Sequence, residues 1–242
     1  MPLTRVAIRA GAQAASVEMA AGLLVPRLIS RTAAEASVAL VAGGALLLGG
    51  DRVEIEIVVG PGCRLDLTDI GGTVAYDAQG VPSSWTVRIR VGVGGLLCWH
   101  GLPLVVATGA NVIRTMRMDL ADGARALLRE TTVLGRDGER GGRLSLRTDV
   151  FRDDVPVIVE SVERDPRRAE PGILGSQRVL DTVLAVGFRP PVSDVDLLLE
   201  QPGALARYLG MQAHLSELDH VWECWRDAAS ASEESVEEVD VR

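Results

Sequence analysis

Apolar residues recur at every second position between residues 53 and 59, at Val53, Ile55, Ile57 and Val59, and the acidic Glu54 and Glu56 lie on the other face. A period of two is typical of a β-strand with one buried face. The strand ends at Gly60-Pro61-Gly62, and this triplet favours a tight turn because proline presets φ and glycine tolerates positive φ. A second apolar run begins at Leu65. The stretch therefore predicts a strand, a turn and a return strand.

The same unit recurs along the middle of the chain. Residues 87–99, 116–128 and 144–159 each contain an alternating strand, a turn and a more apolar return strand. The units recur at roughly 30-residue intervals, and each can bury its apolar face only against its neighbours. We therefore predict a mainly β fold, in which stacked antiparallel β-hairpins form a two-layer, solenoid-like β structure.

The C-terminal third has a different pattern. Residues 215–229 carry an apolar stripe at helical spacing that includes Trp222 and Trp225, and Ser216 precedes it as a candidate N-cap. A helical turn at 204–209 would bring the number of C-terminal helices to about two. We expect residues 1–229 to form a single β-rich domain, and the serine- and glutamate-rich residues 230–242 to form a disordered acidic tail.

Composition limits the function classes. The net charge is −8 and no basic cluster stands out, which argues against nucleic acid binding. Three cysteines lie far apart without a CxxC motif, so a reducing compartment is expected. We find no secretory signal pattern and no run of ~20 apolar residues, which predicts no membrane span and a cytoplasmic protein.

The sequence contains little recognisable catalytic chemistry. It has no P-loop, no nucleophile elbow and no HExxH motif. Cys98 and His100 share one face of a predicted strand and could seat a soft metal, but a pair lacks the three or four ligands of a stable site. Ordinary packing is the favoured interpretation of this pair.

Three acidic residues stand out by position. Asp51 lies in a glycine-rich turn, whereas Glu130 and Glu160 follow buried strands, where an acid is costly unless it is paired or hydrated. On composition alone we favour a solvated rim or salt bridges with arginine. A hydrolase with paired carboxylates on facing strands stays open as an alternative. A generic binding module ranks last, because aromatic residues are only 3% of the chain.

Four successive stretches resemble the motifs of a known family. They are Gly49-Gly50-Asp51 with Gly60-Pro61-Gly62, Leu67-Thr68 running to Tyr76, Leu128–Arg136 with Gly138-Glu139 and Gly142-Arg143, and Asp153–Glu160. In order and spacing they are similar to the UreD (also called UreH) family of urease accessory proteins over roughly residues 20–165. The Gly of the last motif is replaced here by Val155.

The resemblance implies an all-β scaffold that performs no catalysis. Members of this family bind apo-urease and the helical accessory protein UreF, and through UreF they join the GTPase UreG. The assembly delivers nickel to urease, and an internal tunnel has been proposed as its route. Acidic positions along that tunnel match Asp51, Glu130 and Glu160, so nickel would be in transit and no cofactor would be bound tightly.

Overall fold

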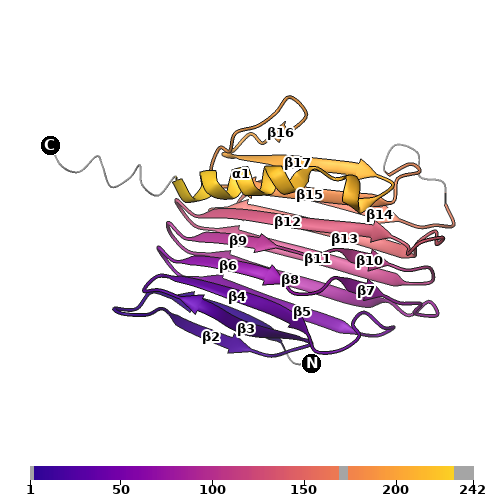
Figure 1. Ribbon diagram of the computed structural model, residues 1–242, viewed down its shortest axis with the longest axis horizontal. Helices are drawn as coiled ribbons and strands as arrows, with labels where there is room; N and C mark the ends of the chain where they lie inside the picture. Colours follow the sequence, from indigo (N-terminus) through magenta and orange to yellow (C-terminus); the bar gives the residue numbers. More distant parts are fainter. Residues whose placement is uncertain (1–2, 169–173, 232–242) are drawn as a thin grey trace.

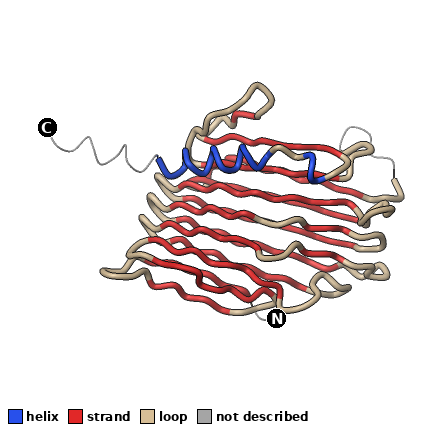
Figure 2. The backbone as a smooth tube through the Cα atoms, in the orientation of Figure 1, coloured by secondary structure: helices blue, strands red, loops and turns tan. Residues whose placement is uncertain are grey.

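The computed structural model describes residues 3–168 and 174–231, which form two facing β-sheets and a C-terminal helix (Figures 1 and 2). Sheet A has seven strands, in the order β14 (Val155–Arg164), β13 (Arg143–Arg152), β11 (Asn111–Leu120), β8 (Ser83–Val91), β5 (Arg52–Val59), β1 (Thr4–Arg9) and β2 (Ser16–Ala20). Sheet B has ten strands, of which eight follow the order β16 (Leu197–Leu198), β17 (Gly203–Gly210), β15 (Val179–Val186), β12 (Arg125–Leu134), β9 (Leu96–His100), β6 (Arg64–Asp69), β4 (Glu35–Ala42) and β3 (Leu24–Arg31). Its other two strands, β7 (Thr73–Ala75) and β10 (Leu104–Val106), pair with each other, and β10 also pairs with β12.

Consecutive strands of the repeating units lie in opposite sheets. Strand β5 belongs to sheet A and β6 to sheet B, and β8 and β9 repeat this arrangement. The connecting turns use glycines with positive φ, at Gly62, Gly94 and Gly123. The turns also stack, because the Gly62 amide donates to the Val93 carbonyl at 2.9 Å and the Gly94 amide to the Asp122 carbonyl at 3.0 Å. The repeats are therefore coils piled on one another.

The predicted two-layer, solenoid-like β structure is confirmed, but strand pairing within it differs from the predicted hairpins. The central strands pair in parallel, β5 with β8 and β8 with β11 in sheet A, and β6 with β9 and β9 with β12 in sheet B. Antiparallel pairs lie toward the two ends of the stack, such as β3 with β4 and β13 with β14. The reason is that the two strands of a unit face each other across the core instead of lying side by side.

The core between the sheets is aliphatic, as the composition indicates. The four apolar positions of β5 are almost completely buried, whereas Glu54 and Glu56 on the opposite side of the strand are partly exposed. Each strand of a coil contributes alternate side chains to the same core. A polar side chain that faces into this core therefore needs a hydrogen-bond or charged partner.

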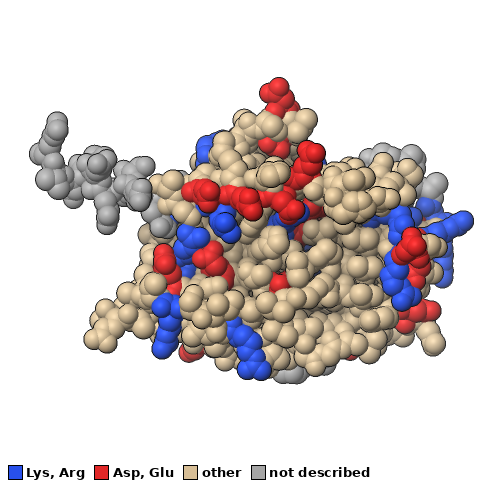
Figure 3. Space-filling model, in the orientation of Figure 1, with Lys and Arg blue, Asp and Glu red and all other residues tan. Residues whose placement is uncertain are grey.

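The helix α1 (Leu218–Ala231) lies on the outer face of sheet B, against β12, β15 and β17, and a single 3-10 turn, η1 (Ala213–Leu215), precedes it (Figure 1). Trp222 and Trp225 face the sheet and pack with apolar residues such as Leu127 and Val183 in a second core. Acidic side chains gather along the exposed side of the helix (Figure 3). The predicted stripe of tryptophans is therefore a packing surface.

Several C-terminal predictions need correction. The helix begins at Leu218, later than predicted, because the Ser216 hydroxyl donates to the Asp181 carboxylate at 2.6 Å and stands before the first helical turn. The helical turn predicted at 204–209 is wrong, since these residues belong to β17. The predicted tail begins inside the helix, which continues to Ala231, and its residues 232–242 lie outside the described part.

A helix that crosses a membrane must be long and apolar. Within residues 3–168 and 174–231, no helix has both the length and the apolar character required.

Candidate functional site: a polar cavity between the sheets

Polar side chains enter the core between the two sheets in the C-terminal half of the stack. A cavity of about 60 Å³ lies there, lined by β11, β13 and β14 of sheet A and by β12, β15 and β17 of sheet B. The period of two places Glu130 on the same inward face as Leu128, and Glu160 on the same inward face as Ile158. This volume has room for a few water molecules. The structure thus brings two of the three predicted acidic residues to one cavity.

Each glutamate is held by an arginine from the opposite sheet. The Arg114 guanidinium on β11 donates to Glu130 Oε1 on β12. Arg207 on β17 donates from both terminal nitrogens to the two carboxylate oxygens of Glu160 on β14, at 2.6 and 2.7 Å. The glutamate side chains retain 31% and 33% exposure, so water reaches these charges. The predicted salt bridges with arginine are confirmed for both acids.

Asp51 lies elsewhere and has a local role. Its carboxylate accepts the Leu48 amide at 3.0 Å, and its own amide donates to the Leu48 carbonyl at 3.0 Å. These bonds close the turn that contains Gly50, whose φ is 89°. Asp51 does not belong to the lining of the inter-sheet cavity.

A third inward acid, Asp69, lies outside the lining of this cavity but on the same sheet as Glu130, and the sequence did not single it out. Its two carboxylate oxygens accept the Trp99 indole N–H at 3.2 Å and the Leu102 amide at 3.1 Å. Burial raises the pKa of Asp69, while these hydrogen bonds and the Arg114 charge lower it and the Glu130 charge raises it. The signal was present in the sequence, because Asp69 continues the inward positions of Leu65 and Leu67 in β6.

The inward polar residues of sheet B form a row across its strands. Glu130 is paired in register with Thr182, and Thr182 with Arg207. Continuing the register of β6, β9 and β12 past His100 places Asp69 and Gly101 in the same row. A Cβ on Gly101 would lie 3.7 Å from Asp69 Oδ2 and only 2.8 Å from the Arg129 carbonyl oxygen. This position therefore has no room for a side chain. We call Asp69, Glu130, Thr182 and Arg207, with Arg114 and Glu160 facing them, the inter-sheet polar row.

This geometry does not suit the hydrolase alternative. A carboxylate pair that cleaves glycosidic bonds needs one protonated acid and one ionised partner. Glu130 and Glu160 instead have the same kind of partner, since each is bound to a guanidinium from the opposite sheet. This pairing does not set one glutamate apart as the acid and the other as its partner.

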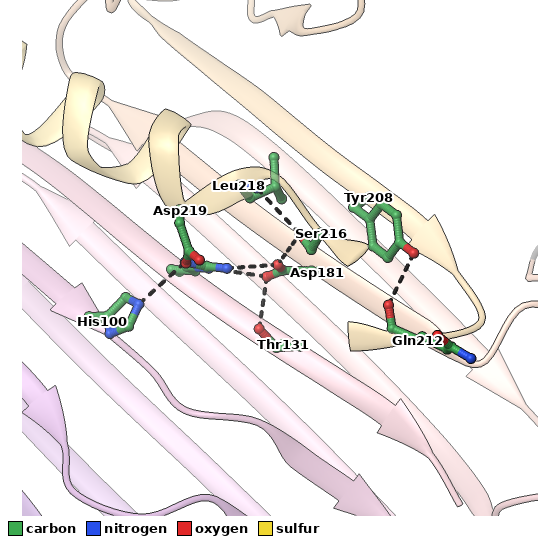
Figure 4. Close-up of polar contacts among 9 residues, drawn as sticks. His100, Thr131, Asp181, Tyr208, Gln212, Ser216, Leu218 and Asp219 are labelled. Atoms are coloured by element: carbon green, nitrogen blue, oxygen red, sulfur yellow. Dashed lines mark hydrogen bonds and ion pairs between the residues drawn. The ribbon is translucent and has the colours of Figure 1, made fainter. Parts of the chain in front are cut away.

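A second polar cluster fastens the start of α1 to sheet B (Figure 4). The Asp181 side chain is only 1% exposed and accepts hydrogen bonds from Arg129 Nη2 at 3.0 Å and from Thr131 Oγ1 at 2.8 Å, in addition to the Ser216 hydroxyl. Arg129 also pairs with Asp219 in the first turn of the helix. A buried carboxylate with this many donors is well satisfied, so the cluster anchors the helix.

Cys98 and His100 face outward from β9 beside this cluster. Burial raises the pKa of the Cys98 thiol to about 12, which disfavours the thiolate that binds metals. His100 stacks against Trp222, with ring centroids 5.1 Å apart, and its Nε2 lies 3.5 Å from Arg129 Nη1. In the described ranges, no group of three or more His, Cys, Asp or Glu side chains is arranged to hold a metal ion. The pair fits the packing interpretation.

We expect His100 to make stability depend on pH. Burial first, and the Arg129 charge second, lower the pKa of His100 below its usual 6.5. The folded protein therefore binds fewer protons at this site than the unfolded chain does, and stability falls as pH drops below about 6.5. We expect His100→Gln to lose less stability than the wild type between pH 8 and pH 5, as measured by urea unfolding. His220→Gln, at an exposed position on α1, is the control and should keep the wild-type pH dependence. Equal pH dependence of wild type and His100→Gln would contradict this prediction.

Comparison with known proteins shows which family this sequence resembles. A family model described as UreD urease accessory protein matches residues 5–239. The urease accessory protein UreD 1 of Streptomyces griseus is 45% identical over 215 residues, which cover 85% of this chain and 84% of that protein. UreD 1 of Saccharopolyspora erythraea is 37% identical over 175 residues, covering 70% and 69% of the two chains. UreD of Streptomyces avermitilis is 32% identical over 202 residues, covering 81% and 77%.

Proposed function

Because this chain belongs to the UreD family of urease accessory proteins, we propose that it is a non-catalytic scaffold that helps to insert nickel into apo-urease in the cytoplasm. In this proposal it binds apo-urease and UreF, and through UreF it joins the GTPase UreG. Nickel is the cargo and passes along the inter-sheet polar row. The chain's own sequence lacks a P-loop, which agrees with a GTP site on a partner.

The observation that carries the proposal is the pair of glutamates in the cavity between the sheets. Carboxylate oxygens are hard ligands, and protein nitrogen and sulfur ligands generally hold Ni²⁺ more firmly. A few water molecules beside two carboxylates provide exchangeable oxygen ligands for a partly hydrated dication. Such an environment supports movement of the ion rather than storage. The three cysteines are all unpaired, which is compatible with the reducing cytoplasm.

Co-purification tests the assembly step. The tagged chain is co-expressed with UreF and apo-urease, and an unrelated β-protein with the same tag is the control. We expect UreF and apo-urease to be retained with this chain and absent from the control. Retention of neither protein by the folded chain would contradict the proposed function.

A further inference from the structure

We propose that Arg114 is a gate in the inter-sheet polar row, holding Glu130 at rest and withdrawing from it when a divalent cation passes. The inference rests on the proposed function and specifies how the same path is controlled. The ligand class is a small, partly hydrated dication that accepts exchangeable oxygen ligands.

Arg114 lies in the row between Asp69 and the cavity that contains Glu160. It extends from sheet A into the core, where its side chain is 15% exposed, and it pairs with Glu130 of sheet B. On one side its charge acts on Asp69, and on the other it lines the cavity that contains Glu160. In this proposal, an ion that moves along the row from Asp69 toward Glu160 passes the pair of Arg114 and Glu130.

The charge of Arg114 opposes that movement while the pair is closed. The guanidinium neutralises Glu130, the carboxylate that a dication would use as its next ligand. It also repels a second positive charge, and this repulsion is stronger between the sheets than in bulk water because the local dielectric constant is lower. The closed pair therefore opposes the passage of a dication electrostatically.

Trp85 is a second partner of the guanidinium and contacts it while the pair with Glu130 is closed. The Arg114 guanidinium carbon lies 5.6 Å from the ring centroid of Trp85, within the range of a cation–π interaction. Trp85 is 6% exposed, and in the described residues its indole N–H is buried without a hydrogen-bond partner. When Glu130 binds the cation instead, this contact with the ring still stabilises the guanidinium.

The two arginine–glutamate pairs differ in strength. Arg207 donates hydrogen bonds to both carboxylate oxygens of Glu160, whereas Arg114 donates only to Oε1 of Glu130. Bidentate pairs are stronger and geometrically more specific than single charged hydrogen bonds. The Arg114 pair is therefore the one that opens first, and the Arg207 pair acts as the firmer clamp between the sheets.

The test uses Mn²⁺ as a paramagnetic dication and the methyl signals of methionine as reporters. Met116 lines the cavity, whereas Met19 is exposed on β2 and reports nonspecific binding. In Arg114→Gln, we expect the Met116 signal to broaden at about tenfold lower Mn²⁺ than in wild type, because one opposing charge near the ion has been removed. Arg117→Gln is the matched control, since Arg117 lies on the same strand but faces outward and pairs with Asp119.

The possible results distinguish failure of the gate from failure of the proposed function. The same Mn²⁺ response of Met116 in wild type and Arg114→Gln, or an equal shift in Arg117→Gln, would overturn the gate. Arg114→Met retains an apolar stem beside Trp85 and should respond like Arg114→Gln, so the test does not depend on the folding of one variant. If the gate is overturned while the wild-type chain still retains apo-urease, the proposed function stands. Loss of that retention contradicts the function itself, whatever Met116 shows.

Discussion

Replacing Asp181 with alanine is expected to lower the free energy of unfolding by about 3–5 kcal/mol, the range found when one partner of a buried ion pair is removed. The Arg129 side chain, which is 9% exposed, would lose its buried partner, and the hydroxyls of Thr131 and Ser216 would lose their acceptor. Urea denaturation followed by circular dichroism measures the change. Because the cluster anchors the start of α1, tryptophan fluorescence from the helix should change in the same transition.

Asp119→Ala is the matched control for this prediction. Asp119 also pairs with an arginine, Arg117, but on the exposed face of sheet A, where the side chains retain 50% and 40% exposure. Exposed pairs of this kind contribute about 0–1 kcal/mol. If Asp181→Ala lowers stability no more than Asp119→Ala does, the buried cluster does not anchor the helix.

Replacing Glu160 with glutamine is expected to lower the nickel content of urease several-fold while the accessory complex still assembles. The amide removes the negative charge from the cavity and leaves Arg207 without its counter-ion, so the path becomes unfavourable for a dication. Metal analysis of purified urease measures the effect, and co-purification of this chain in the same preparation shows that assembly is intact.

Asp51→Asn is the control for nickel loading. The Asp51 carboxylate closes a turn and lies outside the cavity lining, so its amide isostere should leave the nickel content near the wild-type level. Wild-type nickel content in Glu160→Gln, with the chain still present in the complex, would argue against the cavity as the path. A low nickel content in both variants would extend the path to the Asp51 turn.

The sequence predicted the strands more fully than their pairing. The alternation in β5 and the following glycine turn are compatible with a hairpin and with a coil, because both bury alternate residues of two successive strands. What separates them is whether β5 pairs with β6 or with β8, and the structure shows β8. That choice depends on contacts between units far apart in the chain, which the local pattern does not record.

The candidate site was predictable in its acids but not in their partners. Glu130 and Glu160 stand at inward positions of apolar strands, which the period of two indicates. Arg114 and Arg207 are equally inward, but their contacts with these acids depend on which strands face each other across the core. Only the folded stack joins β11 to β12 and β14 to β17 in this way.

The central claim, that this chain helps urease to acquire nickel, is tested most directly by the nickel content of urease made with and without it. Urease and the other accessory proteins are expressed in a host that lacks its own, and nickel per urease active site is measured in each preparation. We predict a low nickel content without the chain and its restoration by the wild-type chain. The same nickel content in both preparations would contradict the account.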